Sequence, residues 1–449
     1  MKPIVISILL LTCSSFYSQY KYLNDYIPCD SCSYITHPLI EIKTWIHIMQ
    51  KSEEDPQNIT IDSMHYIHKQ FQWINQMYSQ LKPPTRPSTN GGKPYVKDSR
   101  IRFTIDTITF HIDSNDWDRM KSSPMIEKRK WLPILKIDPD SNTILIKGIR
   151  DRFRPILDSL IVYKSCCNNG IHHTLKTKRK GDNTLIYIKE NINVEELNFG
   201  FVSYFQTINK NCNKDIWEKH TNEDKTHLHV FYTGASMDVP AFGCGPSPYF
   251  LNVSKIIKNG GYATAQLTAH ELGHCIGLSH TNTPQFNDLP RSDKFGWINC
   301  NQTNTSNNIM GYNTCRNYLS PLQIAHIHYR YSNVDQLINT VKIHSNNQDH
   351  IYINNDTSWH KSIIIDRNIV IKKKQTLTIK KKICMAPNTM IILEKKSKLI
   401  IDDGIIKCCN GSWEGVRKCK SQFNLYKIPK KEKNIAIIEL INNGKLVID

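Results

Sequence analysis

Residues 270–280 read HELGHCIGLSH, and this short stretch constrains the chain more tightly than any other. On a helix, residues four apart lie on the same face, so His270 and His274 can present imidazole nitrogens to one metal ion. His280 would lie about 15 Å along the axis if the helix continued, whereas a zinc to nitrogen bond measures ~2.0 Å. The helix must therefore end before His280. Gly277 is where it can end, because glycine tolerates the left-handed conformation that terminates helices.

The three histidines have the composition of a catalytic zinc site. Three histidines and one water make an open site, whereas structural zinc sites are closed by four protein ligands. Glu271 directly follows the first histidine, and its carboxylate can take a proton from a zinc-activated water that then attacks a peptide carbonyl. We therefore expect one Zn²⁺ bound by His270, His274 and His280, with Glu271 as the general base. The alternative is a structural helix with incidental histidines, but chance matches to the full pattern have odds below ~10⁻³.

The same pattern is the signature of the metzincin clan of zinc peptidases, which the chain resembles here and downstream. A second mark of that clan is a methionine turn beneath the metal, and residues 307–313, NNIMGYN, resemble it. The resemblance implies that Met310 forms an apolar floor under the imidazoles. It also implies that Tyr312 hydrogen-bonds the developing oxyanion, with a tyrosine that only packs as the alternative. The resemblance covers roughly residues 60–332 and is closest to the pappalysin branch, with the matrixins as runner-up.

The resemblance also bears on substrate binding and on two cysteine motifs. Substrates are expected to bind extended along an edge strand above the zinc helix, with residues 243–253 as the candidate rim. Cys275 is turned about 100° past His274, so core packing or a disulfide, with Cys244 as one partner, is favoured over metal ligation. Residues 28–32, PCDSC, only faintly resemble the propeptide latch of matrixins. An ordinary disulfide is therefore expected there rather than a thiolate latch.

The first residues have the pattern of a secretory signal peptide over residues 1–19, with Lys2 followed by an apolar run over residues 4–11. That run is too short to span a bilayer, which takes about 20 residues, and no later stretch approaches this length. Cys13 loosely resembles a lipidation site, but Thr12 is a poor residue before such a cysteine, so secretion is favoured over a lipid anchor. The many other cysteines of an exported chain are expected to form disulfides.

The composition is strongly basic but does not point to a nucleic-acid partner. The 449 residues carry a net charge of +18, and the lysines are scattered rather than gathered beside aromatic residues. A solvated basic surface is the favoured interpretation, so a protein or peptide substrate is expected and nucleic acid is not. The sequence leaves open whether calcium also binds, which oligomer forms and which substrate is used.

The periodicity along the chain predicts an α+β fold with two main domains. We expect an N-terminal segment over residues 20–56 and a metzincin-type zinc peptidase domain over residues 57–335, with a twisted mixed sheet and a zinc helix. The stretch 101–112 predicts one long strand or a tight hairpin. Hydrophobic spacing predicts helices over 37–49, 60–81, 264–276 and 321–329, and strands over 184–188 and 228–232.

Residues 340–449 change to short β-type runs separated by turn residues and lysines. Runs this short and regular indicate strands stacked in a small solenoid or sandwich, and we expect a β-rich, solenoid-like accessory domain. The runs lie at 362–365, 369–371, 376–379, 389–393, 399–401 and 405–406.

A second class of function stays open. A catalytically inactive protein could keep zinc for stability and act in binding or adhesion through its β-rich tail. Glu271 argues against this alternative, because a purely structural zinc site needs only its ligands. A secreted zinc endopeptidase is therefore the expected function.

Overall fold

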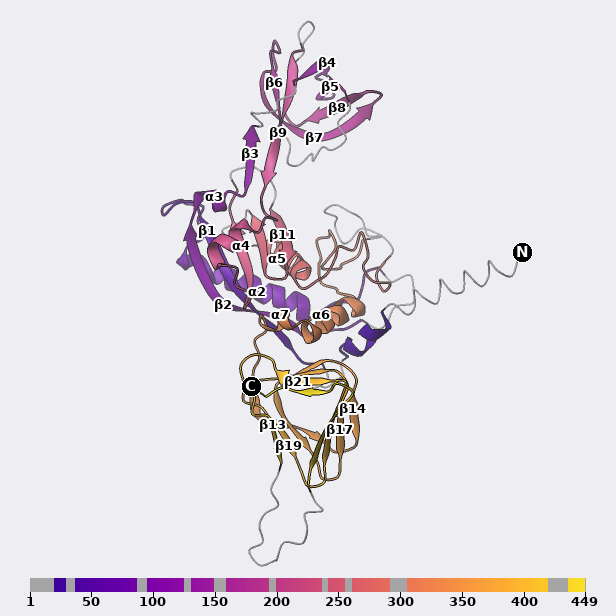
Figure 1. Cartoon of the computed structure of the whole chain (residues 1–449). Coiled ribbons are helices and arrows are strands. Elements are labelled where there is room, and N and C mark those ends of the chain that lie inside the picture. Colours follow the sequence, from indigo (N-terminus) through magenta and orange to yellow (C-terminus); the bar gives the residue numbers. More distant parts are fainter. Residues whose placement is uncertain are drawn as a thin grey trace, which may run out of the picture.

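The computed structural model shows a central body of helices and one sheet, with a small barrel on one side and a solenoid of parallel strands on the other (Figure 1). This mixture of helices and strands confirms the α+β class. The predicted signal peptide lies outside the described residues. The structure describes residues 20–29, 37–86, 95–124, 131–148, 159–193, 199–235, 241–254, 261–290, 305–418 and 435–448.

The central body is built on a mixed five-stranded sheet with the order β11-β12-β10-β1-β2. Four strands are parallel, and β11 pairs antiparallel with β12 at one edge. The predicted strands over 101–112 and 228–232 are confirmed as β2 and β10, and β2 is a single strand rather than a hairpin. The bounds are β1 Ile40–Gln50, β2 Ile101–Ile112, β10 Leu228–Thr233, β11 Phe242–Ser247 and β12 Phe250–Ser254.

The helix predicted over residues 37–49 is wrong, because this segment forms β1 between β2 and β10. Ile40, Ile42, Ile46 and Ile48 alternate along it and are all buried, which is the two-residue period of a strand. The sheet therefore begins at Ile40, N-terminal to the domain boundary expected at residue 57.

Two helices, α2 and α5, pack together on one face of this sheet. The Tyr78 hydroxyl of α2 donates to the Ala269 carbonyl of α5 at 2.9 Å, and the Tyr232 hydroxyl of β10 lies 3.3 Å from the Thr268 hydroxyl of α5. The three helices predicted after residue 57 are confirmed, with bounds shifted by a few residues. The helices are η1 Lys21–Tyr26, η2 Ile61–Ser63, α2 Met64–Ser79, α3 Ser114–Trp117, α4 Asp215–Thr221, α5 Tyr262–Cys275, α6 Pro321–Asn333 and α7 Asp335–Ile338.

A barrel that the sequence did not predict is inserted between α3 and α4. Strands β3 and β9 leave the central body as an antiparallel pair, and the sheet continues as β9-β4-β5-β8-β7-β6, closed by the pairing of β6 with β9. Ten buried apolar residues fill its interior. Its strands are β3 Met120–Pro124, β4 Leu132–Asp138, β5 Thr143–Lys147, β6 Ser159–Tyr163, β7 Gly170–Lys180, β8 Asn183–Ile188 and β9 Phe201–Asn209.

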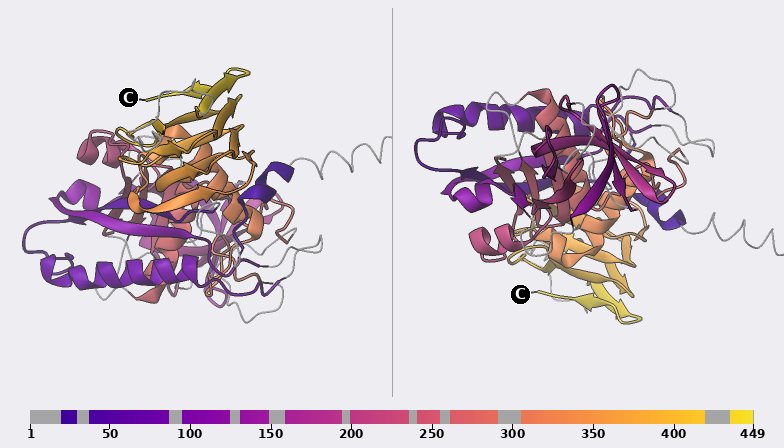
Figure 2. Two further views of the ribbon diagram at one scale, coloured as in Figure 1. Left: turned by 90° about the horizontal axis from the view of Figure 1, so that it is seen from below. Right: turned by 90° about the horizontal axis from the view of Figure 1, so that it is seen from above.

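The C-terminal strands form a three-sided solenoid of parallel sheets around one apolar core. The colour passes from orange to yellow along it, so successive turns of the chain stack in sequence order (Figure 2). Lys382 and Lys407 both contact the Asp335 carboxylate of α7, at 2.9 and 2.7 Å, and join the solenoid to the central body. Its strands are β13 Asn346–Ile353, β14 Thr357–Trp359, β15 Ile363–Ile365, β16 Arg367–Ile371, β17 Thr376–Ile379, β18 Lys382–Met385, β19 Ile391–Leu393, β20 Lys398–Asp402, β21 Ile405–Cys408, β22 Val416–Lys418, β23 Ile437–Ile441 and β24 Lys445–Leu446.

Several cysteines form disulfides, as the sequence analysis predicts. Cys212 pairs with Cys244, and Cys384 pairs with Cys409. The suggested pairing of Cys244 with Cys275 is therefore wrong. Cys275 is instead a buried thiol 3.4 Å from the Phe250 carbonyl oxygen, so its role is core packing.

Among the described residues, no helix is both long and apolar enough to cross a membrane.

Candidate metal centre

Helix α5 carries His270 and His274 one turn apart and ends where the chain must turn back. The last helical residue is Cys275, and Gly277 follows with a φ of +104°. The Leu278 amide then donates to the Gly273 carbonyl at 2.9 Å, a bond that closes the helix end around a left-handed residue. The predicted reversal at Gly277 is confirmed, and it brings His280 back to the other two histidines.

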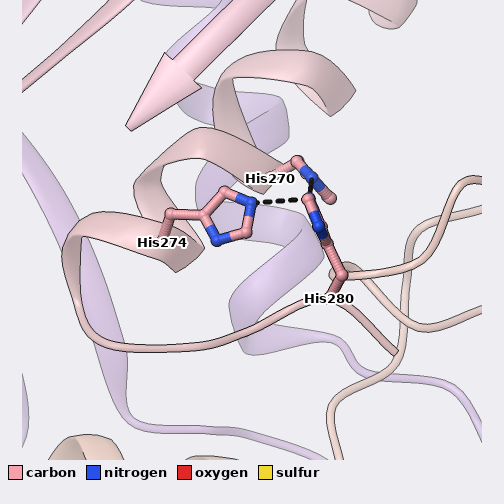
Figure 3. Close-up of side chains that lie close together, drawn as sticks. All are labelled: His270, His274 and His280. Atoms are coloured by element: carbon pink, nitrogen blue, oxygen red, sulfur yellow. Dashed lines mark hydrogen bonds between the residues drawn. The ribbon is translucent and has the colours of Figure 1, made fainter. Parts of the chain in front are cut away.

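The Nε2 atoms of the three imidazoles converge on one point (Figure 3). The Nε2 of His280 lies 2.8 Å from that of His274 and 3.1 Å from that of His270. His270 is fully buried in the core, and the other two side chains are partly buried. Residues ten positions apart in the chain thus meet in one cluster.

The outer nitrogens of two rings fix their tautomers. The Nδ1 of His270 lies 2.8 Å from the Ile309 carbonyl oxygen, and the Nδ1 of His274 lies 2.8 Å from the Leu278 carbonyl oxygen. A carbonyl oxygen only accepts, so both Nδ1 atoms carry the proton in the neutral ring. Both Nε2 atoms therefore present lone pairs to the centre of the cluster, as in metal-ligating histidines held by an outer hydrogen bond.

Burial keeps these rings in the form that binds metal. Desolvation lowers the pKa of His270 well below its usual value and lowers that of His274. Burial, the neighbouring His274 and the Arg316 guanidinium lower the pKa of His280 to about 4. All three rings are consequently neutral at neutral pH, which is the protonation state of a metal ligand.

The cluster fits a tetrahedral zinc ion closely. Bonds of ~2.0–2.1 Å would hold the ligand nitrogens about 3.3 Å apart, and the two closest pairs here are 2.8 and 3.1 Å apart. Small rotations of the rings by a few tenths of an ångström would accommodate the ion. Three neutral imidazoles are also the donor set that zinc prefers for an open site.

Glu271 lies beside the cluster in a buried position against the edge strand β11. It is only 5% exposed, and the Gly245 amide of β11 hydrogen-bonds its carboxylate. Burial raises the pKa of Glu271 to about 7, while the Arg316 guanidinium and the Gly245 bond act in the opposite direction. A carboxyl group with a pKa near the working pH is suited to taking up and releasing a proton.

The turn at residues 307–313 lies directly under the helix, as the methionine-turn resemblance implies. A Cβ on Gly273 of α5 would lie 2.2 Å from the Met310 sulfur, so the thioether fills the space that a larger residue at 273 would need. Met310 is fully buried, and its carbonyl accepts from the Thr281 amide at 3.2 Å. The turn thereby contacts both helix α5 and the loop segment that carries His280.

Tyr312 points its hydroxyl into the histidine cluster. That oxygen lies 3.1 Å from the Nε2 of His280, and the two ring centroids are 4.9 Å apart. Burial and the nearby Glu271 carboxylate raise the pKa of Tyr312, so the phenol is protonated and can donate a hydrogen bond. The structure therefore brings together every residue predicted for this site.

One residue of the site, Arg316, was missed by the sequence analysis. Its guanidinium is buried and donates to the Gln266 carbonyl at 2.8 Å and to the Gly311 carbonyl at 3.2 Å. It links α5 to the methionine turn and places a positive charge near Glu271 and Tyr312. A single arginine outside any periodic pattern gives no signal in the sequence.

A second group of possible ligands, Asp113, Asp116 and His220, lies on the other side of the sheet. Here the Lys219 ammonium contacts both carboxylates, and Arg119 donates to Asp116 at 2.7 Å. Charged side chains of the protein already neutralise this group, so it forms an ion-pair network. In the histidine cluster, by contrast, the Nε2 lone pairs of His270 and His274 face the centre.

Comparisons with protein-family models and with curated protein sequences find no match. The likeness to metzincins therefore stands on the motifs at residues 270–280 and 307–313. What the site does has to be inferred from its own geometry.

Proposed function

We propose that the protein is a secreted zinc-dependent endopeptidase of the metzincin type. The observation that carries this proposal is the convergence of three Nε2 atoms at 2.8 and 3.1 Å while the Nδ1 groups of His270 and His274 are committed to carbonyls. The Nε2 lone pairs of His270 and His274 thus both face the Nε2 of His280. A zinc ion held by these three nitrogens would use all of them as ligands.

The chain's own residues supply the remaining parts of peptide hydrolysis. A bound zinc ion would polarise the scissile carbonyl and lower the pKa of its water toward ~7. Glu271 accepts the proton of the attacking water and delivers it to the leaving amine. The Tyr312 hydroxyl donates a hydrogen bond to the oxygen that gains negative charge. The Arg316 charge favours the ionised carboxylate that Glu271 needs for the first step.

The edge strand β11 offers a place for the substrate. β11 is the outer strand of the sheet, and it lies against Glu271 through Gly243 and Gly245. An extended peptide can add to such an edge by main-chain hydrogen bonds, with its scissile bond beside the metal. This part of the proposal implies cleavage within unfolded or extended segments, which is endopeptidase activity.

The variant Glu271→Gln tests the proposed reaction. It keeps the size of the side chain but removes the base, so we expect zinc to remain bound while cleavage falls by roughly 10²–10⁴-fold. Purified wild type and variant are incubated with a peptide library and read by mass spectrometry, and zinc is measured by elemental analysis. We expect removal of zinc with a chelator to abolish cleavage by the wild type and re-addition of zinc to restore it.

Asn115→Gln serves as the matched control, since Asn115 is an exposed side chain of α3 outside the site. It should cleave the library at the wild-type rate. Unchanged cleavage by Glu271→Gln would refute the assigned base. Bound zinc with no cleavage by the wild type under any condition would favour an inactive, zinc-stabilised binding protein instead.

A further inference from the structure

The inserted barrel carries an ordered row of positive charges on strand β7. Lys176, Lys178 and Lys180 occupy alternate positions and are all exposed. They pair across the ladder with Tyr187, Leu185 and Asn183 of β8. Paired residues lie on one face of a sheet, and the intervening Ile186 is buried in the barrel. The three lysines therefore share the outer face of the β7–β8 ribbon.

The row has a fixed spacing. Alternate residues of a strand are about 6.8 Å apart, so the backbone positions of the three lysines stand at regular intervals along about 14 Å. Arg179, next to the row, is also exposed, and Asp182 in the following turn is the nearest acidic residue in sequence. Among the described residues, no carboxylate forms an ion pair with any of the three lysines. Their charge is available to a partner.

An extended peptide with acidic side chains at every second position has the same repeat. Its carboxylates project from one side about 6.8 Å apart and can meet the lysines one to one. A single-stranded nucleic acid also carries regular negative charge, but it binds chiefly by stacking bases on aromatic rings. Tyr187 is the aromatic residue in this row, and the Lys176 ammonium lies over its ring at 4.2 Å from the centroid. The ribbon therefore suits an acidic peptide better.

We propose that the outer face of the β7–β8 ribbon is a docking surface for an extended acidic segment of another protein. Identifying that protein as a substrate rests on the proposed function, whereas the binding itself does not. In a protease, such a surface holds a substrate at a distance from the metal and raises the local concentration of its other segments at the active site.

The base of the barrel is built to hold this surface in a defined direction. Arg119 precedes β3, is 1% exposed, and donates to the Lys210 carbonyl at 2.7 Å, directly after β9. The same guanidinium is paired with Asp116 of α3 and Asp215 of α4. The antiparallel strands β3 and β9, which form the stalk of the barrel (Figure 1), are thus both tied to the central body through the buried Arg119 guanidinium. A docked segment would therefore be carried on a barrel whose base is anchored to the central body.

Fluorescence anisotropy with the full-length protein tests the proposal. The probe is a short labelled peptide of alternating Glu and Ser, compared with a peptide of the same composition that has its glutamates in one block, and with oligothymidylate. The triple variant K176E/K178E/K180E is compared with K373E/K374E/K395E, whose lysines are exposed turn residues of the solenoid. Circular dichroism checks that both variants fold.

We expect the wild type to bind the alternating peptide more tightly than the blocked one, with affinity that falls as salt increases. The barrel variant should lose about tenfold or more, and the solenoid variant less than about twofold. Equal losses in both variants, no preference for the alternating peptide, or tighter binding of oligothymidylate through the same lysines would each overturn the proposal.

A second measurement separates this proposal from the proposed function. Peptides from the cleavage screen are extended by the alternating acidic segment, and kcat/KM is compared with that of the unextended peptides. The extension should raise kcat/KM for the wild type, through KM, and not for the barrel variant. If no peptide is cleaved, the zinc peptidase proposal fails, while the anisotropy result still decides whether the docking surface exists.

Discussion

The Tyr312 hydroxyl is the group of the site whose role depends most on a single contact. It lies 3.1 Å from the Nε2 of His280, a distance from which it can also reach an oxygen at the centre of the cluster. Tyr312→Phe removes this donor and keeps the ring. We expect kcat to fall about ten- to hundredfold with little change in KM or zinc content, because the lost bond acts mainly in the transition state. Steady-state kinetics with a peptide from the screen check this, and an unchanged kcat would mean that the tyrosine only packs.

Gly277 is the residue on which the return of His280 depends. Its φ is +104°, and a Cβ there would lie 1.7 Å from the Arg330 Nη1. Gly277→Ala should therefore lower the free energy of unfolding by about 2 kcal/mol or more and weaken zinc binding, measured by urea unfolding and by competition with a zinc chelator.

Gly261 provides the matched control at the other end of α5. A Cβ at this position meets nothing within 4 Å, and its φ of −65° suits any residue. Gly261→Ala should cost at most about 1 kcal/mol and leave zinc affinity unchanged. Equal zinc affinities in the two variants would remove the assigned role of Gly277.

A row of three histidines, two buried and one partly buried, joins three strands of the central sheet on the face opposite α5. The Nδ1 of His47 in β1 lies 2.9 Å from the Nε2 of His111 in β2, and its Nε2 lies 2.9 Å from the Nδ1 of His229 in β10. His229 then contacts Asp224 at 3.1 Å. Burial lowers the pKa of His47 to about 2 and those of His111 and His229 to about 4. These rings are neutral in the folded protein.

This row predicts a loss of stability in mild acid. The unfolded histidines titrate near pH 6.5 and the folded ones at or below about pH 4, so the unfolded state binds more protons between these values and stability rises with pH. We expect chelator-treated protein to lose at least about 2 kcal/mol of unfolding free energy between pH 6.5 and 5. His220, His227, Asp113 and Asp116 also face the row, and the lowered pKa values of the two aspartates place the titration of these carboxylates at lower pH.

Urea unfolding at several pH values measures this loss, and His47→Gln should reduce its slope. The metal is removed beforehand so that release of zinc does not contribute, and the difference between wild type and His47→Gln separates the row from His270, His274 and His280, whose pKa values are also lowered. A free energy of unfolding that stays constant from pH 6.5 to 5 would contradict the interpretation of the row as buried neutral histidines.

The same elements show which parts of the fold the sequence could predict. Helix α5 and its end were predictable because the spacing of His270 and His274 requires a helix, and because Gly277 allows that helix to end before His280. Strand β1 was misread as a helix because it is buried on both faces near its end, where His47 and Met49 interrupt the alternation. Arg316 gave no signal because its role depends on contacts with carbonyls distant in the chain.

At the scale of the whole molecule, local patterns predicted the solenoid but not the barrel. The short runs after residue 340 repeat at regular intervals, and each repeat pairs with its neighbour in sequence. The barrel instead closes through the pairing of β6 with β9, two strands far apart in the chain. Of its strands only Thr184 to Ile188, in β8, had an alternation clear enough to predict. Non-local pairing of this kind leaves no periodicity in the sequence.

Charged contacts join the barrel and the solenoid to the central body. Arg119 ties the barrel stalk to the central body, and Asp335 receives Lys382 and Lys407 from the solenoid. In the proposed protease, the central body supplies the metal site and its edge strand, and the barrel supplies a separate docking surface. Proteolysis requires a metal ion at the histidine cluster, and so does any role of the docking surface in proteolysis.

X-ray absorption at the zinc edge of the purified protein tests most directly whether His270, His274 and His280 bind a zinc ion. The proposal predicts one zinc per chain with three nitrogen neighbours and one oxygen neighbour at about 2.0–2.1 Å, and loss of the ion in His280→Ala. Protein without zinc after reconstitution, or zinc closed by four protein ligands, would contradict it.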